Sequence, residues 1–311
     1  MRLSTDNRIL AMICVLGGVA LASGQDAVVK FMSSSYPAYE TLLFRCIGTI
    51  PVMMFFLWYE GKGWRITSPL WRRILLRGAI LGIAYLGFVL ALPAMPIANA
   101  VAIYFTMPFF VAGFAGPMLG ERVRMHRWFA IAAGFIGVLI MVRPGSGVFE
   151  PASLLALISA MGYAFGQMIG RPISQTTPPI IIAVWQNFTY ASIAISLLLL
   201  FNVFVDADFT HPSLVFLSRP WVWPTLPHLA LLFGHGMLAA CAMLLFVNAY
   251  KHGEANFVAP FEYSSMIWAV MFGLVLFGEF PDAYTWVGAA IVITAGILMI
   301  LRDRQLDRSV A

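Results

Sequence analysis

The sequence predicts an all-α membrane protein with ten transmembrane helices, arranged as two inverted five-helix repeats. Three features support this prediction: the composition, the recurrence of long apolar runs, and an internal repeat. Of the 311 residues, 61% are hydrophobic and only 11% are charged, and the mean hydropathy is +0.86. Soluble domains carry about 25% charged residues. This chain therefore has too few charges to cover a globular surface exposed to water.

Apolar runs of about 20 residues recur along the chain, and each is long enough to cross a hydrocarbon core of about 30 Å. The first run is expected to stay in the protein, because it is too long for a signal peptide and no small-residue cleavage pattern follows it. The cysteines Cys14, Cys46 and Cys241 lie inside apolar runs, at spacings that suit neither a disulfide nor a metal site. The predicted spans are 9–32, 38–59, 73–93, 97–119, 127–143, 152–171, 180–203, 227–249, 256–277 and 284–301.

The positions of the Lys and Arg residues predict the orientation, since cytoplasmic loops carry an excess of positive charge. An even number of spans places both chain ends on the same side. Of the 19 Lys and Arg residues, Lys30, Arg143 and Arg219 flank the opposite side. Arg45 lies inside a span, and all the others flank the side of the chain ends. Both termini are therefore expected in the cytoplasm of a bacterium, with the chain in the inner membrane. The net charge of +5 follows from this topology and needs no nucleic-acid partner.

The two halves of the chain repeat each other. The stretch ASGQ at 22–25 returns as AFGQ at 164–167, an offset of 142 residues. The stretch GERVRMHRW at 120–128 returns as GEFPDAYTW at 278–286, where Gly, Glu and Trp are offset by 158 residues. A single insertion in the long 202–226 loop reconciles the two offsets.

We therefore expect a first repeat at 1–145, a second at 150–302 and a short cytoplasmic tail at 303–311. Each repeat has an odd number of spans, so the second enters the membrane in the opposite sense. Inverted repeats of this kind are typical of secondary transporters.

The chain resembles the EamA branch of the drug/metabolite transporter superfamily. The resemblance rests on the division of ten spans into two halves, the Pro-Ile-Ala-Asn-Ala stretch at 96–100 and the Gly-Glu-Arg at 120–122. The second copy departs from the pattern, since Gly278-Glu279 is followed by Phe280 and not by a base. The resemblance implies transport of small metabolites, such as amino-acid-, flavin- or nucleoside-like molecules, through a central cavity between the halves. It fixes neither the substrate nor the direction.

Four charged residues at matching depths suggest two ion pairs within the membrane. Asp26 and Arg45 lie about 9–10 Å below the outer ends of their spans, at 1.5 Å per residue. Lys30 and Glu40 match similarly, one step nearer the outside. A bare charge in hydrocarbon costs a few kcal/mol, so partners or a wet cavity are expected. The two pairs either clamp a helical hairpin or form a charged gate along the cavity wall.

The repeated Gly-Gln stretches indicate a site near the centre. Gly24-Gln25 and Gly166-Gln167 are related by the repeat, and glycine lets another backbone or a ligand come close. The two glutamines are expected to face each other and to contact substrate. The alternative is that their amides form hydrogen bonds between the first and sixth spans.

Glu262 and its repeat mate Tyr104 lie in spans that contain Pro260 and Pro108 respectively. Interrupted spans often form binding sites in transporters. Glu262 could carry H+ as a coupling ion or balance a cationic substrate, or it could be a neutral, hydrogen-bonded carboxyl. The other candidate contacts for a flat or heteroaromatic substrate are Tyr263, Trp185, Asn187, Tyr163, Trp268, Tyr85 and Asn248.

Nothing in the sequence predicts an enzyme, a cofactor or a metal site. A channel-like facilitator is the alternative class, although no pore motif is present. A membrane-embedded lipid transferase is a further alternative, and its only candidate residues are the outer-loop residues Asp206, Asp208, His211 and His228. The lone histidine of the eighth span, His235, is expected to be structural. The expected partners are the lipid bilayer and a small-molecule substrate, in a monomer or homodimer.

Overall fold

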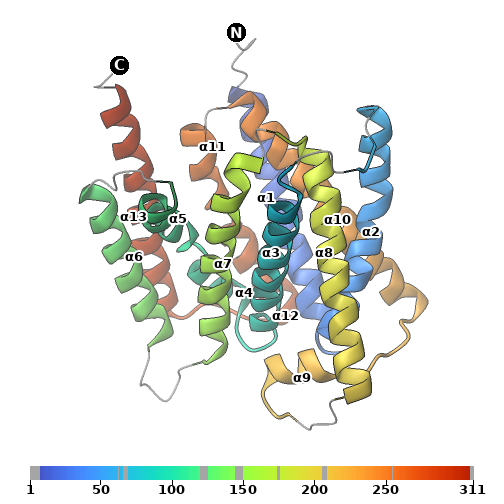
Figure 1. Cartoon of the computed structure of the whole chain (residues 1–311). Coiled ribbons are helices and arrows are strands. Elements are labelled where there is room, and N and C mark those ends of the chain that lie inside the picture. The colour runs from blue at the N-terminus through green and yellow to red at the C-terminus, as the bar shows by residue number, and fades with distance from the viewer. Residues whose placement is uncertain are drawn as a thin grey trace.

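The computed structural model is a bundle of helices in which both termini lie at one end and α9 lies at the other (Figure 1). It describes residues 8–61, 63–65, 69–119, 125–143, 150–173, 176–204, 209–253 and 255–308, and these contain no strand. Ten helical segments in this part of the chain are long and apolar enough to cross a membrane, which confirms the predicted all-α class and the number of spans. We call the end of the bundle opposite the termini the distal end.

The helices of the first half are α1 (Arg8–Met32), α2 (Ala38–Tyr59), α3 (Trp71–Ala91), α4 (Ile97–Tyr104), α5 (Met107–Leu119) and α6 (Met125–Val142). Those of the second half are α7 (Ala152–Ile173), α8 (Pro179–Leu199), the π-helix η1 (Leu200–Phe204), α9 (Pro212–Ser218), α10 (Leu226–His252), α11 (Ala255–Glu262), α12 (Ser265–Phe277) and α13 (Ala283–Arg308). The short helix α9 forms within the predicted 202–226 loop.

Prolines define where several helices start. Pro37, Pro96 and Pro178 directly precede α2, α4 and α8, with φ angles of −71°, −56° and −57°. Their fixed φ suits the start of a helix, and the N–H that proline lacks would have no partner there. Each proline thus turns the chain back into the bundle.

The fourth and ninth spans are each broken in the middle, as predicted. α4 ends before Phe105-Thr106 and α12 begins after Tyr263-Ser264. These two breaks are 158 residues apart, the same offset as the repeated Gly-Glu motif. The predicted cause is wrong for the ninth span, because Pro260 lies inside α11 and precedes the break by three residues. The rings of Phe105 and Tyr263 pack edge to face, with centroids 4.9 Å apart, so the two breaks touch.

Most of the large helix–helix contacts join equivalent helices of the two halves or occur in equivalent pairs. α1 packs on α10 and α3 packs on α7, while α2 contacts α8 and α6 contacts α13. Glycines permit the closest crossings. A Cβ on Gly48 of α2 would collide with the backbone of Phe233, and a Cβ on Gly236 of α10 would collide with the carbonyl of Arg45. This crossing fixes the backbone of α2 beside Arg45.

Candidate substrate-binding site

Arg45 of α2 lies beside a pair of tyrosine rings. Its guanidinium carbon lies 4.6 Å from the ring centroid of Tyr85 on α3 and 5.4 Å from that of Tyr190 on α8. The two rings are stacked, with centroids 5.7 Å apart. Cation–π contact holds the guanidinium in place. Among the described residues it makes no recorded hydrogen bond, and its buried Nε has no partner.

Asp26 is the acidic residue expected to pair with Arg45. The structure places both side chains half-buried and within electrostatic reach of each other. It records no hydrogen bond or direct ion pair between these two described residues. The match in depth thus correctly placed Asp26 near Arg45, but the two charges do not form an ion pair.

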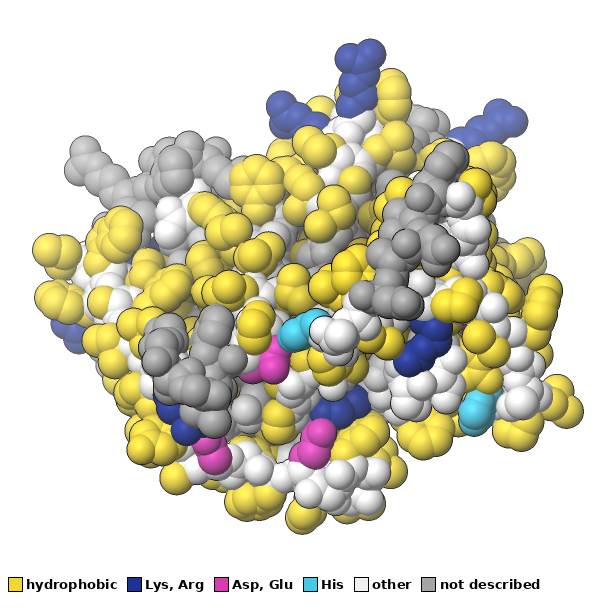
Figure 2. Space-filling view, turned by 90° about the horizontal axis from the view of Figure 1, so that it is seen from below, with side chains coloured by type: hydrophobic (Ala, Val, Ile, Leu, Met, Phe, Trp, Pro, Cys, Tyr) yellow, Lys and Arg dark blue, Asp and Glu magenta, His cyan; other side chains and the backbone are white. Residues whose placement is uncertain are grey.

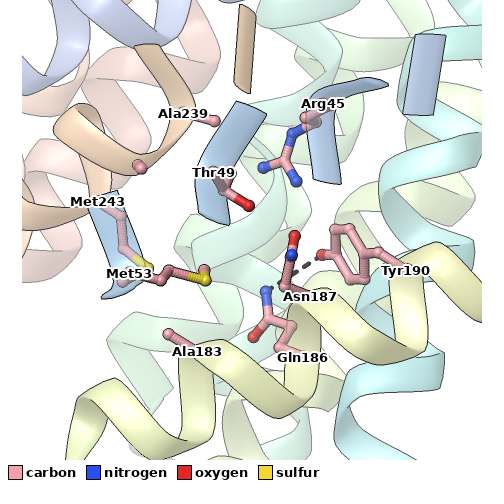
Figure 3. Close-up of a pocket in the computed structure, with 10 residues that line it drawn as sticks. Arg45, Thr49, Met53, Ala183, Gln186, Asn187, Tyr190, Ala239 and Met243 are labelled. Carbon is pink, nitrogen blue, oxygen red and sulfur yellow. Dashed lines mark hydrogen bonds between the residues drawn. The ribbon is translucent and has the colours of Figure 1, made fainter. Parts of the chain in front are cut away.

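A cavity of about 140 Å³ lies beside Arg45, between α2, α8 and α10 (Figure 3). Asn187, one of the residues predicted to contact substrate, lines this cavity. Its Nδ2 donates to the carbonyl of Cys46 at 3.1 Å, and its Oδ1 is buried without a partner. The cavity is also lined by Arg45, Thr49, Met53, Gln186 and Tyr190.

Arg45 and Asn187 are related by the internal repeat. They are 142 residues apart, the offset that also relates Gln25 to Gln167. The cavity therefore lies where equivalent positions of the two halves meet, with a base on one side and an amide on the other.

Gln167 is held by a second arginine. Arg77 of α3 donates to Oε1 of Gln186 at 2.8 Å and to Oε1 of Gln167 at 3.4 Å. Gln186 in turn donates to the hydroxyl of Tyr190 at 3.3 Å, so one network connects Gln167 with the cavity wall. Sequence reasoning missed Arg77 and Gln186, because both lie near the predicted ends of spans.

The expected face-to-face arrangement of Gln25 and Gln167 is not recorded. α1 packs on α10 and α12, whereas α7 packs on α3, α4 and α5, so the two amides have different neighbours. Gln25 is buried, and no hydrogen bond joins it to a described residue of α7. The interhelical bond that forms is the one from Arg77 to Gln167.

The aromatic candidates divide between two places. Tyr104 packs edge to face on Tyr163, with centroids 5.9 Å apart, in the centre of the bundle. Glu262, also near this centre, accepts a hydrogen bond from Tyr250. The hydroxyl of Tyr263 is buried without a partner. Trp185 instead donates to the carbonyl of Trp64, outside the cavity lining.

His235 of α10 lies against the site and is fully buried. Its Nε2 is 3.2 Å from the hydroxyl of Tyr85, and its Nδ1 has no partner. Arg77 is its repeat mate, at the 158-residue offset. His235 was expected to be structural, and its hydrogen bond to Tyr85 agrees with this, because it holds one of the two rings that contact Arg45.

The predicted pairing of Lys30 with Glu40 is wrong. Nζ of Lys30 lies 2.7 Å from both carboxylate oxygens of Glu279 and donates to the carbonyl of Met95 at 2.7 Å. Glu40 instead accepts from the backbone N–H of Val222 at 3.2 Å. Equal depth does not fix the direction in which a side chain points around its helix, and Lys30 points away from α2.

Glu279 is therefore a functional candidate that sequence reasoning missed. It follows Gly278, whose positive φ of 65° ends α12 in the left-handed conformation that favours glycine. This turn brings the carboxylate of the second half onto Lys30 of the first half. The repeated Gly-Glu motif was the signal that could have found it.

The distal end carries further polar contacts between segments. Figure 2, viewed from that end, shows acidic and basic side chains next to one another in a largely hydrophobic face. Arg143 pairs with Asp282, and His211 lies 2.9 Å from Glu150. Of the outer-loop residues considered for a transferase, Asp206 and Asp208 lie outside the described residues. Among the residues that are described, no group of three His, Cys, Asp or Glu side chains could hold a metal ion.

The segment after α9 is tied to the distal ends of α1 and α2. Arg219 donates to the carbonyl of Ser33 at 2.8 Å, and burial lowers the pKa of this guanidinium. Tyr39 donates to the carbonyl of Arg219 at 2.7 Å, and His228 bonds the hydroxyl of Tyr36 at 2.8 Å. These contacts cover the distal end of the bundle beside Lys30.

Several known proteins are similar to this chain over most of its length. Over 284 residues, which are 91% of each chain, it is 27% identical to an S-adenosylmethionine uptake transporter of Rickettsia bellii. It is 31% identical to a riboflavin transporter of Rhizobium johnstonii over 78% of this chain and 74% of that protein. A pseudopaline exporter of Pseudomonas aeruginosa is 25% identical over 89% of this chain and 91% of its own length.

One solved structure, described only as a crystal structure of a protein, shares the fold with a TM-score of 0.60. It is 17% identical and covers 95% of this chain and 98% of its own. The family match covers residues 9–143 and again 151–302, so the same sequence pattern is present twice. The chain belongs to the EamA-like transporter family.

Proposed function

We propose that this protein is a secondary active transporter that moves a small metabolite across a bacterial inner membrane by alternating access. The observation that carries the proposal is the cavity beside Arg45, which is lined by α2 of the first half and by α8 and α10 of the second. A site shared by two halves changes shape when one half moves against the other.

The distal contacts support the same mechanism. Lys30 and Glu279 join the two halves at the distal end, and the cavity beside Arg45 lies deeper in the bundle. If both termini are cytoplasmic, as the positive-inside rule predicts, this arrangement is closed towards the outside. Opening would then require the pair to separate.

The family match at two positions and the broken fourth and ninth spans favour two inverted repeats. An odd number of spans in each half gives the opposite sense. The packing of α1 on α10 and that of α7 on α3 are equivalent contacts under the repeat, which agrees with this arrangement.

The names of the relatives support a small-metabolite substrate. Two are named for uptake or transport of S-adenosylmethionine and riboflavin, and one for export of pseudopaline. We infer an amino-acid-, flavin- or nucleoside-like metabolite for this chain. Glu262 is the candidate carrier of a coupling H+.

Counterflow in proteoliposomes tests the proposal. Vesicles containing the purified protein are preloaded with unlabelled S-adenosylmethionine or riboflavin and diluted into the labelled compound. An alternating-access transporter accumulates label transiently above its equilibrium level, whereas a channel-like facilitator only equilibrates it. Equilibration without overshoot would favour the channel, and no protein-dependent flux of either compound would exclude both as substrates.

A further inference from the structure

On the basis of the proposed transport function, we propose that Arg45 binds the carboxylate of the transported molecule and that Asn187 binds the neighbouring amino group. The substrate class is then a metabolite with a free amino-acid end. S-adenosylmethionine has such an end, and riboflavin has neither group.

Arg45 differs from the other described bases discussed above. Lys30 and Arg143 each have a carboxylate partner, and Arg77 is held by two amide oxygens. Arg45 contacts only tyrosine faces, although a guanidinium carries five N–H donors. A charge withdrawn from water is costly unless it is paired and hydrogen-bonded. Its donors are thus available to an anion that is not part of the chain.

The cavity beside Arg45 suits a carboxylate in size and chemistry. Its volume of about 140 Å³ exceeds what one water needs, about 10–15 Å³. A planar guanidinium binds a carboxylate through two parallel hydrogen bonds. Figure 3 shows Arg45 and Asn187 on facing elements of the cavity wall.

Asn187 supplies the complementary group. Its Nδ2 is engaged by the carbonyl of Cys46, which orients its Oδ1 as an acceptor without a partner. An acceptor beside an arginine matches an amino group beside a carboxylate. Because Arg45 and Asn187 occupy equivalent positions of the two halves, a rocking motion would move the two ends of this clamp against each other.

The rings of Tyr85 and Tyr190 explain how Arg45 is held without ligand. Both rings contact the guanidinium, and no acceptor among the described side chains takes its N–H donors. A role in stability alone would also explain the two ring contacts. The test therefore needs a readout that depends on the carboxylate of the ligand.

The experiment uses the full chain in lipid nanodiscs and compares S-adenosylmethionine with decarboxylated S-adenosylmethionine by calorimetry. The two ligands differ only in the carboxylate. Wild type is expected to prefer the first by about 10- to 100-fold, as for a charged hydrogen-bonded contact. In Arg45→Gln the ratio should fall to about 1, and in Arg45→Lys it should be intermediate, because an ammonium lacks the planar fork.

Arg72→Gln is the matched control, since Arg72 is exposed and lies over the ring of Trp71. It should keep the wild-type ratio. Asn187→Leu should weaken both ligands equally, because both carry the amino group. A wild-type ratio near 1, or equal losses for both ligands in Arg45→Gln, would overturn the proposal.

A second measurement covers the case in which S-adenosylmethionine does not bind. The thermal shift of wild type and Arg45→Gln is measured with the common amino acids and with their primary amides. The proposal requires at least one acid to stabilise wild type more than its amide does, and this difference must vanish in Arg45→Gln. If no acid does so, Arg45 is structural. If ligands bind in an Arg45-dependent way but no counterflow is seen, the proposed transport function is refuted and this inference stands. If counterflow is seen but does not depend on Arg45, this inference is refuted and the transport function stands.

Discussion

Lys30 of α1 and Glu279 at the end of α12 form an ion pair that joins the two halves of the chain at the distal end. The ammonium is 7% exposed and the carboxylate 29% exposed, at a distance of 2.7 Å. Lys30 also donates to the carbonyl of Met95, so its charge is satisfied from both halves.

Glu279→Gln should lower the melting temperature of the purified protein, because it leaves the buried ammonium of Lys30 without its anion. The loss should stay below the about 3–5 kcal/mol of a fully buried pair, since Glu279 is partly exposed. Lys30→Met combined with Glu279→Gln should recover part of the loss, as contacting residues do in a double-mutant cycle. Additive effects would show that the pair is not energetically coupled, and Arg302→Gln at an exposed position of α13 serves as control.

Asp26→Asn and Arg45→Gln should each lower the melting temperature, because each removes the opposite charge that acts on the other. Since the two groups make no direct contact among the described side chains, their coupling should be small, about 0.5–1 kcal/mol, at the low end for interacting residues. Thermal unfolding of both single variants and the double variant measures it. A coupling of several kcal/mol would require direct contact in solution.

Gln167→Ala should lower the melting temperature, whereas Gln25→Ala should leave it nearly unchanged. Gln167 accepts a partly buried hydrogen bond from Arg77, and the loss of a bond to a charged group costs about 1–3 kcal/mol. Gln25 makes no recorded hydrogen bond to another described residue, so its amide remains available to substrate. Gln25→Ala should therefore weaken binding of whichever ligand the thermal-shift screen identifies. Equal melting temperatures for both variants would contradict this assignment.

The spans could be predicted because long apolar runs specify membrane helices by length and composition alone. Pro108 and Pro260 also predicted that the fourth and ninth spans are interrupted, and the breaks at Phe105 and Tyr263 are related by the offset of the repeat. Helix α9 was missed, since its seven residues are too short for a periodic pattern to stand out.

The site was predicted only in part. Depth along a helix can be counted from the sequence, which placed Asp26 near Arg45. The direction of a side chain around the helix depends on packing, so Lys30 was paired with Glu40 instead of Glu279. Gln186 belongs to the cavity because α8 packs on α2, a contact that no local sequence signal specifies.

Asp282 should contribute to acid stability at the distal end. Burial alone would raise the pKa of this carboxyl, but hydrogen bonds from Thr285 and the guanidinium of Arg143 outweigh it and lower the pKa. A lowered pKa in the folded state stabilises the protein above the unfolded pKa of about 3.9, and this stabilisation is lost as the pH falls through the folded value. The melting temperature of Asp282→Asn should thus lie below that of wild type at pH 6, and the difference should shrink towards pH 3. A constant difference would show that the pairing with Arg143 does not matter.

Glu262→Gln should abolish acceleration of transport by a proton gradient while leaving equilibrium exchange intact. An amide cannot carry a proton between the two sides, but it can still accept the hydrogen bond that Tyr250 donates to Glu262. Uptake into proteoliposomes is measured with and without an imposed pH gradient, for a substrate that passes the counterflow test. Tyr250→Phe is the matched control, because it removes the hydrogen bond and keeps the carboxyl, so its uptake should still respond to the gradient. If Glu262→Gln responds as wild type does, the coupling ion is not carried by Glu262, and the carboxyl serves to hold α10 against α11.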